Sequence, residues 1–218
     1  MISVVIPAHN EERYLPGTLE ALFEETRCAF ECIVVPNGCA DRTEEIAGQF
    51  PVEVVVVERA NLSNARNVGA AHALYPYLLF LDADIRVVPG FLPALLRKAK
   101  ERKAAVVLGD FDPDSPTPKA KSFLAMHNFF HQAFRGPMGF TFTRRDVFEK
   151  VGGYDEGSEP AEDIDYVRRA LRHGTFAYLK YPRPIMSMRR FEKLGYVRTT
   201  LNWMTGPFTR GREYKVVR

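Results

Sequence analysis

The sequence has few cysteines and no long apolar run. Only Cys28, Cys32 and Cys39 occur among its 218 residues, an odd number without C-x-x-C spacing. A disulfide framework is therefore not expected, and a reducing compartment fits better. No stretch approaches the ~20 apolar residues that cross a bilayer. The first apolar run has no basic segment before it, so we expect a first strand instead of a signal peptide, in a cytoplasmic protein.

The chain also lacks a strong excess of charge of either sign. Its 30 Lys and Arg against 27 Asp and Glu give a net charge of +3, too small to predict nucleic-acid binding. The 46% hydrophobic and 26% charged residues exclude a disordered, collagen-like or coiled-coil chain. However, residues 180–218 carry a net charge of +8 and residues 1–179 carry −5. This basic C-terminal stretch predicts contact with an anion such as a phosphate or a lipid headgroup.

Several common catalytic motifs are absent. The sequence has no GxxxxGK[ST], GxGxxG, HExxH or GxSxG, so the kinase, dehydrogenase, zinc-protease and α/β-hydrolase classes lose support. Among the five histidines only His127 and His131 are four residues apart. They lie in a Phe-rich stretch, where a packed helix face with Phe123, Met126, Phe130 and Phe134 is the better explanation than a metal site.

Short apolar runs alternate with amphipathic stretches in the first half of the chain. Strands are expected at 2–6, 32–35, 52–57, 77–81 and 105–108, and helices at 11–25, 41–48, 61–74 and 89–102. The second helix is expected to start with a capping box formed by Asp41 and Glu44. Continuous apolar strands, each followed by a helix, predict an α/β fold with a parallel sheet covered on both faces.

The second half is less regular. Helices are expected at 119–134, 160–173 and 192–204, strands at 136–143 and 175–179, and a Pro-rich loop at 112–118. We find no repeat and no linker long enough to separate domains. The sequence therefore predicts one domain with an irregular second half.

Polar clusters follow three of the expected strands. In parallel sheets ligands bind beyond the carboxyl ends of the strands, where His9-Asn10-Glu11, Asn37-Gly38 and Asp82-Ala83-Asp84 stand. Two carboxylates at i and i+2 after a buried strand repel each other unless a cation offsets them. Mg²⁺ or Mn²⁺ with oxygen ligands is the natural partner. A solvated turn that caps the next helix is the alternative, but the setting favours a metal.

Charged residues elsewhere give weaker signals. Arg66 lies in an Ala/Asn-rich helix, where its donors can meet a carbonyl or a phosphate, although this segment alone favours a surface arginine. Four acids stand within residues 159–165 at a helix N-terminus, where the helix dipole favours them. On this helix Glu162 and Asp165 are expected to share one side. Asp163 points elsewhere and is a candidate general base, an interpretation that weighs equally with the dipole.

The basic C-terminal stretch contains adjacent arginines. Arg189 and Arg190 point in different directions, so at most one is expected to reach a shared ligand, where it would neutralise a diphosphate leaving group. Solvated charges at a helix start are an equal alternative. Aromatic residues interleave with the basic ones, which suits peripheral contact with a membrane, although packing of an amphipathic last helix explains them better. These aromatic residues are Phe191, Tyr196, Trp203 and Phe208.

Six motifs follow one another in an order that is recognisable as a set. They are Val4-Val5-Ile6-Pro7-Ala8-His9-Asn10-Glu11-Glu12, Val34-Val35-Pro36-Asn37-Gly38-Cys39-Ala40-Asp41, Asn64-Ala65-Arg66-Asn67-Val68-Gly69, Phe80-Leu81-Asp82-Ala83-Asp84, Gly152-Gly153-Tyr154-Asp155-Glu156 and Glu162-Asp163-Ile164-Asp165. This order resembles the family 2 glycosyltransferases, which have the GT-A fold, and it extends through most of residues 2–180. Arg189-Arg190-Phe191 is similar to the R-R-W/F element of some members.

The resemblance implies a metal-dependent, inverting transfer of a sugar from a nucleotide-diphosphate donor. The acceptor would be a hydroxyl of a saccharide or of a lipid-linked molecule, and the cofactor Mn²⁺ or Mg²⁺. The GT-A domain would span residues 1–180, with a nucleotide-binding half at about 1–110 and an acceptor half at about 111–180. Residues 181–218 would be a basic extension packed on the same domain.

The resemblance also implies roles for individual residues. Asp84 would bind the metal directly, Asp82 would serve the ribose and the metal's water shell, and Asp163 would deprotonate the acceptor. Residues 136–140 would form the floor near the transferred sugar, and Arg189 or Arg190 would meet the diphosphate. The implied nucleotide-binding residues are Pro7, Ala8, Glu11, Asn37, Arg66 and Asp82.

One departure from the family pattern concerns the nucleobase. Members commonly have D-D-G-S after the second strand, whereas Pro36-Asn37-Gly38-Cys39 stands here. An Asn amide both donates and accepts hydrogen bonds, so base binding is retained but its choice is less determined. We expect a UDP-sugar first and a GDP-sugar second. A non-catalytic nucleotide-sugar-binding protein and a sugar-1-phosphate nucleotidyltransferase are the competing hypotheses. The retained carboxylates argue against the first, and the lack of a G-G-x-G-T-R loop argues against the second.

Overall fold

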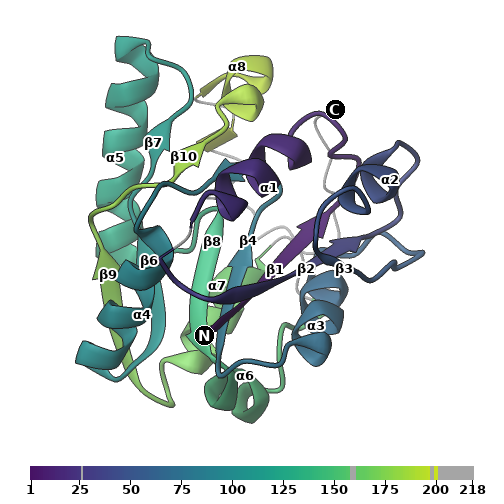
Figure 1. The fold of residues 1–218 in the computed structure, drawn as a ribbon. Helices are drawn as coiled ribbons and strands as arrows, with labels where there is room; N and C mark the ends of the chain where they lie inside the picture. Colours follow the sequence, from purple (N-terminus) through teal and green to yellow (C-terminus); the bar gives the residue numbers. More distant parts are fainter. Residues whose placement is uncertain (26, 158–160, 197–198, 201–218) are drawn as a thin grey trace.

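A seven-stranded sheet forms the middle of the molecule, with helices on both of its faces (Figure 1). The computed structural model describes residues 1–25, 27–157, 161–196 and 199–200. The strands of the large sheet are β1 (Ile2–Ala8), β2 (Phe30–Pro36), β3 (Glu53–Val54), β4 (Tyr77–Leu81), β6 (Ala104–Gly109), β8 (Phe140–Arg144) and β9 (Thr175–Leu179). Their order across the sheet is β3-β2-β1-β4-β8-β6-β9.

A second, three-stranded sheet lies beside the ends of the large one. It consists of β5 (Ile85–Arg86), β10 (Ile185–Met186) and β7 (Asp112–Pro113), in that order. The helices are α1 (Leu15–Phe23), α2 (Thr43–Ala47), α3 (Leu62–His72), α4 (Phe91–Arg102), α5 (Pro118–Phe134), α6 (Arg145–Val151), α7 (Glu162–Ala170) and α8 (Arg189–Leu194). No helix of the described residues is long and apolar enough to span a bilayer.

The alternation of side chains along β1 explains the three layers. Ile2, Val4 and Ile6 pack with α1, α4 and the start of α5, whereas Val5 packs with α3, α6 and α7 on the other face. Successive side chains of a strand point to opposite faces, so a strand that is apolar throughout needs a cover on both sides. The predicted α/β class with a mostly parallel sheet is confirmed.

Strand β8 is the exception to the parallel arrangement. It runs antiparallel to both of its neighbours, β4 and β6, and Phe140 pairs with Leu81. Its first residue therefore lies at the carboxyl end of β4. As a result, the main-chain N–H of Asp82 donates to the carbonyl oxygen of Gly139 over 2.9 Å. This reversal brings the connection between α5 and β8 to the edge that carries the polar clusters.

Several predicted boundaries differ from the structure. The helix expected at 11–25 begins at Leu15, the strand expected at 52–57 is limited to β3, the expected 112–118 loop contains β7, and β5, β10 and α6 were not predicted. The predicted capping box is wrong. Arg42 is the N-cap residue of α2, and the Asp41 carboxylate instead accepts from Thr43 N–H and Glu12 N–H. The helix expected at 192–204 is interrupted: α8 begins at Arg189 and ends at Leu194 before Gly195, and Tyr196, Thr199 and Thr200 are again helical. Residues 201–204 lie outside the described residues.

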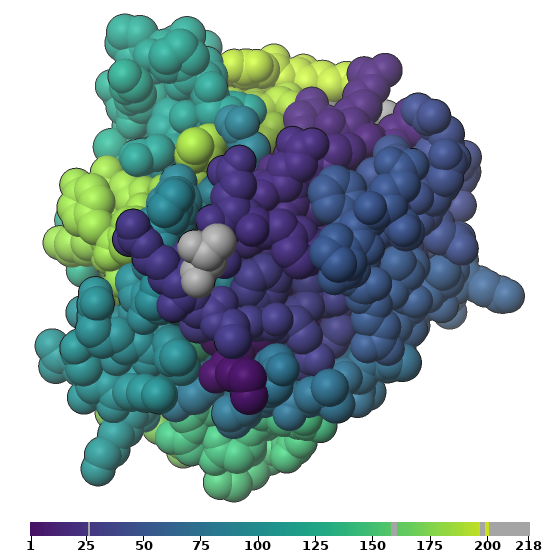
Figure 2. All heavy atoms as spheres, viewed as in Figure 1, coloured from purple at the N-terminus to yellow at the C-terminus, as the bar shows by residue number. Residues whose placement is uncertain are grey.

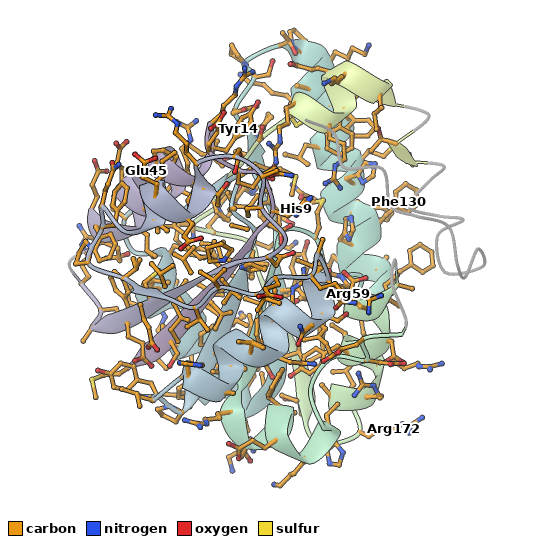
Figure 3. The ribbon with its side chains drawn as sticks, turned by 90° about the vertical axis from the view of Figure 1, so that its right-hand side faces the viewer. His9, Tyr14, Glu45, Arg59, Phe130 and Arg172 are labelled. Atoms are coloured by element: carbon orange, nitrogen blue, oxygen red, sulfur yellow. The ribbon has the colours of Figure 1, made fainter. Side chains whose placement is uncertain are left out.

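Helix α5 packs differently from the single buried face expected. His127 is buried, and the Phe123 ring lies 4.9 Å from that of Phe191 in α8. Met126, Phe130 and Phe134 are instead 44%, 47% and 77% exposed. Figure 3 shows Phe130 on the opposite side of the molecule from Glu45 of α2. The three cysteines are free, as expected.

Candidate functional site

The polar clusters after β1, β2 and β4 meet at one edge of the sheet, as predicted. Ala8 pairs with Pro36, and β1 lies between β2 and β4. The N–H of Asn37 donates to the carbonyl of Ala8 over 2.9 Å, and His9 Nδ1 lies 2.6 Å from the Asn37 carbonyl oxygen. Because a carbonyl only accepts, His9 carries its proton on Nδ1 in this contact. The three loops thus form one continuous rim.

Arg66 occupies the centre of this edge. It is 4% exposed, and its Nη1 lies 2.9 Å from Asp163 Oδ1 and 3.1 Å from Glu162 Oε1. Its Nη2 lies 3.3 Å from Asp163 Oδ2 and 3.5 Å from Asp82 Oδ1. The guanidinium group also lies 5.0 Å from the centre of the Tyr154 ring. One buried arginine on α3 therefore joins the loop after β4 to the first turn of α7, and we call this group the Arg66 junction.

The Arg66 junction corrects two expectations. Arg66 is not a surface arginine, because α7 covers it from 96 residues further along the chain. Glu162 does not share a side with Asp165: Glu162 and Asp163 both contact Arg66, while Asp165 pairs with Arg168 and Arg169. Asp163 lies beside Arg66 and Asp82 at the edge that carries the polar clusters, and its role as general base stays a prediction. Glu159, the remaining acid of this cluster, lies outside the described residues.

The carboxylates of the junction have raised pKa values. Burial raises the pKa of Asp163 to about 7, although Arg66 beside it lowers this value. Burial likewise raises the pKa of Asp82 to about 6, against the lowering effect of Arg66 and, more weakly, of Arg190. Removal from water disfavours the charged form, and here a single arginine does not compensate for it. Burial therefore leaves the Asp163 carboxylate more basic than an exposed one, in spite of Arg66.

The floor of the site comes from the connection between α5 and β8. Pro137, Gly139 and Phe140 line a small hollow together with Arg66, Asp82 and Asp163. Gly139 has φ +67°, and a Cβ there would lie 3.0 Å from both Ile85 Cδ1 and Met186 Cε. The positive φ favours glycine, and any larger residue would also have to displace these two side-chain ends. The residues expected to form this floor, 136–140, thus adjoin the Arg66 junction.

Arg189 closes the other end of the rim. Its guanidinium donates to Glu11 Oε1 and, over 3.1 Å, to Asp84 Oδ2, and it lies 4.0 Å from the centre of the Tyr14 ring. These contacts tie α8 to the loops after β1 and β4. Figure 2 shows the yellow-green atoms of α8 between the teal atoms of α5 and the purple atoms of the N-terminal region. We call the group of Arg189, Glu11 and Asp84 the Arg189 corner.

The Glu11 carboxylate of the Arg189 corner is buried, and its pKa is shifted as a result. Burial raises its pKa to about 7, although the hydrogen bond from Arg189 lowers this value. Its Oε2 is buried and has no hydrogen-bond partner among the described atoms. A buried oxygen without a partner costs free energy unless a ligand or a water supplies one. The corner therefore has an unused acceptor beside Asp84.

The carboxylates of the Arg189 corner, together with the neighbouring Asp82, are ligands of the kind that a hard divalent cation prefers. The described residues contain no group of three or more His, Cys, Asp or Glu arranged to hold a metal by themselves. Mg²⁺, however, is usually held by one or two carboxylates, while waters and substrate phosphates complete its coordination. Asp84, Asp82 and the unpaired oxygen of Glu11 supply oxygen ligands of that kind. Arg189 is the cation that Asp84 contacts here.

The predicted base-binding residues are mostly buried. Pro7 and Ala8 end β1 with little exposure, and Asn37 is 3% exposed. The Asn37 amide Nδ2 donates to the carbonyls of Ala8 and Val35 over 3.0 and 3.3 Å. Asn37 therefore links β1 to β2 at the rim, and its contact with a nucleobase stays a prediction.

Three residues of the site were not predicted. Tyr154 lies under Arg66, Tyr14 lies under Arg189, and Glu162 is the most buried of the carboxylates that Arg66 contacts. Tyr154 belongs to the Gly-Gly-Tyr-Asp-Glu motif, so a signal existed for it. Trp203 and Phe208, on which the membrane expectation rested in part, lie outside the described residues.

Comparison with known proteins agrees with this geometry. The family model described as glycosyl transferase family 2 matches residues 3–152. An uncharacterized glycosyltransferase of Haemophilus influenzae is 26% identical over 201 residues, which cover 85% of this chain and 67% of that protein.

Two solved structures show the same fold. The crystal structure of S. aureus TarS 1–349 in complex with UDP-GlcNAc has a TM-score of 0.71 and 18% identity, with 85% of this chain and 58% of that chain covered. Mannosyltransferase PcManGT from Pyrobaculum calidifontis, in complex with GDP-Man and Mn²⁺, has a TM-score of 0.69 and 16% identity, with 93% and 64% covered. This chain thus spans about two thirds or less of the length of each of these three proteins.

Proposed function

Because the chain belongs to the family 2 glycosyltransferases, we propose that it transfers a sugar, with inversion, from a nucleoside-diphosphate donor to an acceptor hydroxyl. The Arg66 junction is the observation that carries the proposal. It holds Asp82, which follows β4, beside Asp163, which begins α7, at a hollow whose floor is residues 137–140. A donor-side carboxylate and a candidate base thus border the same small space.

Asp163 is the proposed general base. An acceptor hydroxyl is a weak nucleophile, so a base must take its proton as the new bond forms. The pKa of Asp163, raised to about 7 by burial, suits this role because the group is both partly ionised and basic near neutral pH. Arg66 keeps enough of it ionised and orients both of its oxygens. A single inverting displacement needs no enzyme nucleophile.

The proposed donor is a UDP-sugar first and a GDP-sugar second. The TarS complex contains UDP-GlcNAc and the PcManGT complex contains GDP-Man, so both nucleotides occur with this fold. We assign the nucleotide to the rim formed by Pro7, Ala8, Glu11 and Asn37, with Arg66 and Asp82 at its inner end. Parallel α/β sheets bind nucleotides at such an edge.

The proposed cofactor is Mn²⁺ or Mg²⁺, held by Asp84 and Asp82. PcManGT was crystallised with Mn²⁺, and the unpaired Glu11 oxygen lies in the corner that we assign to the cation. Such an ion stabilises the negative charge that develops on the leaving diphosphate. Arg189 neutralises Glu11 and Asp84 before ligands arrive and then turns to the diphosphate, which accepts the same fork of donors. Arg190, which lowers the pKa of Asp82, would face the same corner.

A thermal-shift panel tests the donor and the metal. The protein is heated with UDP-, GDP- and dTDP-sugars, each with and without Mn²⁺. A ligand present at a hundred times its dissociation constant stabilises the folded protein by about 2.7 kcal/mol. We expect stabilisation by one nucleotide class and only with the metal. Equal stability in all samples would overturn the proposed donor site.

A single substitution then separates catalysis from binding. Asp163→Asn should lower turnover by roughly 10²–10⁴-fold while donor-induced stabilisation persists. Asp165→Asn is the matched control, because Asp165 lies on the same helix but pairs with Arg168 and Arg169 away from the hollow. Release of nucleoside diphosphate is expected. Release of pyrophosphate would indicate a nucleotidyltransferase, and binding without turnover in the wild-type protein would indicate a binding protein.

A further inference from the structure

The outer face of α5 is apolar and aromatic. Phe129, Phe130 and Phe134 are 67%, 47% and 77% exposed, and Met126 is 44% exposed. The Phe130 ring contacts the other two, with centroids 5.8 Å apart for Phe129–Phe130 and 6.1 Å apart for Phe130–Phe134. Soluble proteins rarely expose adjoining aromatic side chains of this kind without a partner.

A basic hollow adjoins the end of this helix. It has a volume of about 390 Å³ and is lined by Lys98 and Arg102 of α4, by Gln132 and Ala133 of α5, and by Arg135. Phe176 and Tyr178 of β9 complete it. Among the described residues, Lys98, Arg102 and Arg135 take part in no ion pair, and Arg135 lies 5.4 Å from the Phe176 ring centre. Three cations thus converge without an acid to neutralise them.

Two acids that adjoin lining residues of the hollow, Asp110 beside Tyr178 and Glu101 beside Arg102 in the sequence, are already engaged. Asp110 accepts from Tyr178 and pairs with Arg183, and its side chain is 8% exposed. Glu101 pairs with Arg97. Helix α5 itself contains no acidic residue. The positive charge at the hollow is therefore available to an external anion.

We propose that the outer face of α5 and the adjoining basic hollow form a docking site for a lipid surface that carries anionic headgroups. Phe129, Phe130 and Phe134 enter the boundary between headgroups and acyl chains, and the hollow takes a headgroup phosphate. An amphipathic helix with aromatic residues on one side and cations beside them binds such interfaces. Each cation near an anionic membrane adds to the attraction.

The positive charge of the hollow favours an anionic lipid surface over a second copy of the chain as the partner of this face. In a twofold dimer the same patch meets itself. The cations of the hollow would then be brought toward an identical set, which disfavours the contact. An anionic lipid surface supplies the opposite charge to the hollow and an apolar layer to the rings. Docking does not depend on sugar transfer, and it is measured without a donor.

The position of the face relates it to the site. Helix α5 ends at Phe134, and residues 135–137 lead directly into the floor at Gly139 and Phe140. Docking through the end of α5 would place the acceptor side of the site close to the lipid. This surface is different from the basic C-terminal stretch that the sequence suggested.

Vesicle flotation of the full chain tests the proposal. Vesicles of phosphatidylcholine alone are compared with vesicles that also contain phosphatidylglycerol. We expect binding to the anionic vesicles and weak binding to the neutral ones. Replacing Lys98, Arg102 and Arg135 by Gln should lower the partition coefficient roughly 100-fold. Replacing the three phenylalanines by Ser should lower it by roughly tenfold or more, with an unchanged circular dichroism spectrum because these rings are exposed.

Matched controls separate the local site from general charge. Replacing the exposed residues Arg13, Arg59 and Arg172 by Gln removes the same net charge outside α4 and α5. Leu74→Ser removes another exposed apolar side chain, 75% exposed and far from α5 in sequence. Both controls should bind like the wild type. The proposal is overturned if the wild type floats with neither vesicle, or if the charge controls lose as much binding as the hollow variant. A phenylalanine variant that floats normally but elutes later in gel filtration would assign the face to a second copy instead.

Discussion

Replacing Arg66 by methionine should destabilise the protein, and the loss should grow with pH. Arg66 is 4% exposed and is the cation that contacts Glu162, Asp163 and Asp82. Methionine fills a similar volume without charge, so three carboxylates lose their shared partner. The carboxylates that remain ionised then lie close together with reduced access to water, which destabilises the folded protein.

The structure gives both the size and the pH dependence of the effect. Removing one partner of a buried ion pair costs about 3–5 kcal/mol. We expect the lower end, about 3 kcal/mol, because the side chains of Asp82 and Asp163 keep 41% and 30% exposure, whereas Glu162 keeps 8%. Asp82 and Asp163 have folded-state pKa values raised from 3.8 to about 6 and about 7. Ionising them therefore costs stability as the pH rises through this range. Without Arg66 that cost increases, so the variant loses most above about pH 7.

Urea unfolding followed by circular dichroism, at about pH 5 and about pH 8, measures the difference. A loss of about 3 kcal/mol corresponds to a melting temperature lower by roughly 6–12 °C in a domain of this size. Arg168→Met is the control, since Arg168 is 74% exposed and should change stability by less than about 0.5 kcal/mol. A loss of equal size at both pH values, or no loss at the higher one, would refute the electrostatic role of the Arg66 junction.

Three further measurements follow from the site and the core. Turnover should rise with pH up to about 7, where Asp163 becomes ionised, and a flat profile across this range would contradict its role as base. Arg189→Met should lower the dissociation constant of Mn²⁺ for the donor-free protein roughly fivefold, since Asp84 loses a competing cation. Electron paramagnetic resonance of free Mn²⁺ measures this constant, and an unchanged value would exclude competition between Arg189 and the metal for Asp84. Gly69→Ala should lower the free energy of unfolding in urea by about 1–3 kcal/mol, because the added Cβ would overlap Val5 Cγ1. An unchanged urea midpoint would show that α3 can move away from β1 without cost.

Local patterns predicted most of the architecture of the first half of the chain. The apolar runs of β1, β2, β4 and β6 are continuous, and parallel pairing brings their carboxyl ends to one edge whatever the details of the helices. The meeting of the Glu11, Asn37 and Asp82 loops was therefore predictable. Helix α6 was missed although a signal existed: Val147, Phe148 and Val151 are spaced for a helix, and Gly152 follows at its end with φ +77°.

The long-range contacts could not be read from local patterns. The burial of Arg66 depends on α7, which packs over α3 from far along the chain, and nothing in the segment around Arg66 encodes that cover. The antiparallel direction of β8 could not be predicted either, because an alternating strand pattern does not specify the partner strand. For α5, apolar spacing indicated one face, but Phe130 and Phe134 belong to a second apolar side that the described residues leave exposed.

The antiparallel strand β8, which lies between β4 and β6, determines which segment at the edge of the sheet can vary in sequence. The main-chain hydrogen bond between Asp82 and Gly139 uses no side chain of residues 135–138, so substitutions at those positions do not remove either of its atoms. Residues 135–138 can consequently change in composition while β4 and β8 keep their register. If the proposed function holds, a change of acceptor would require a new connection between α5 and β8, while the carboxylates that follow β4 would stay in place.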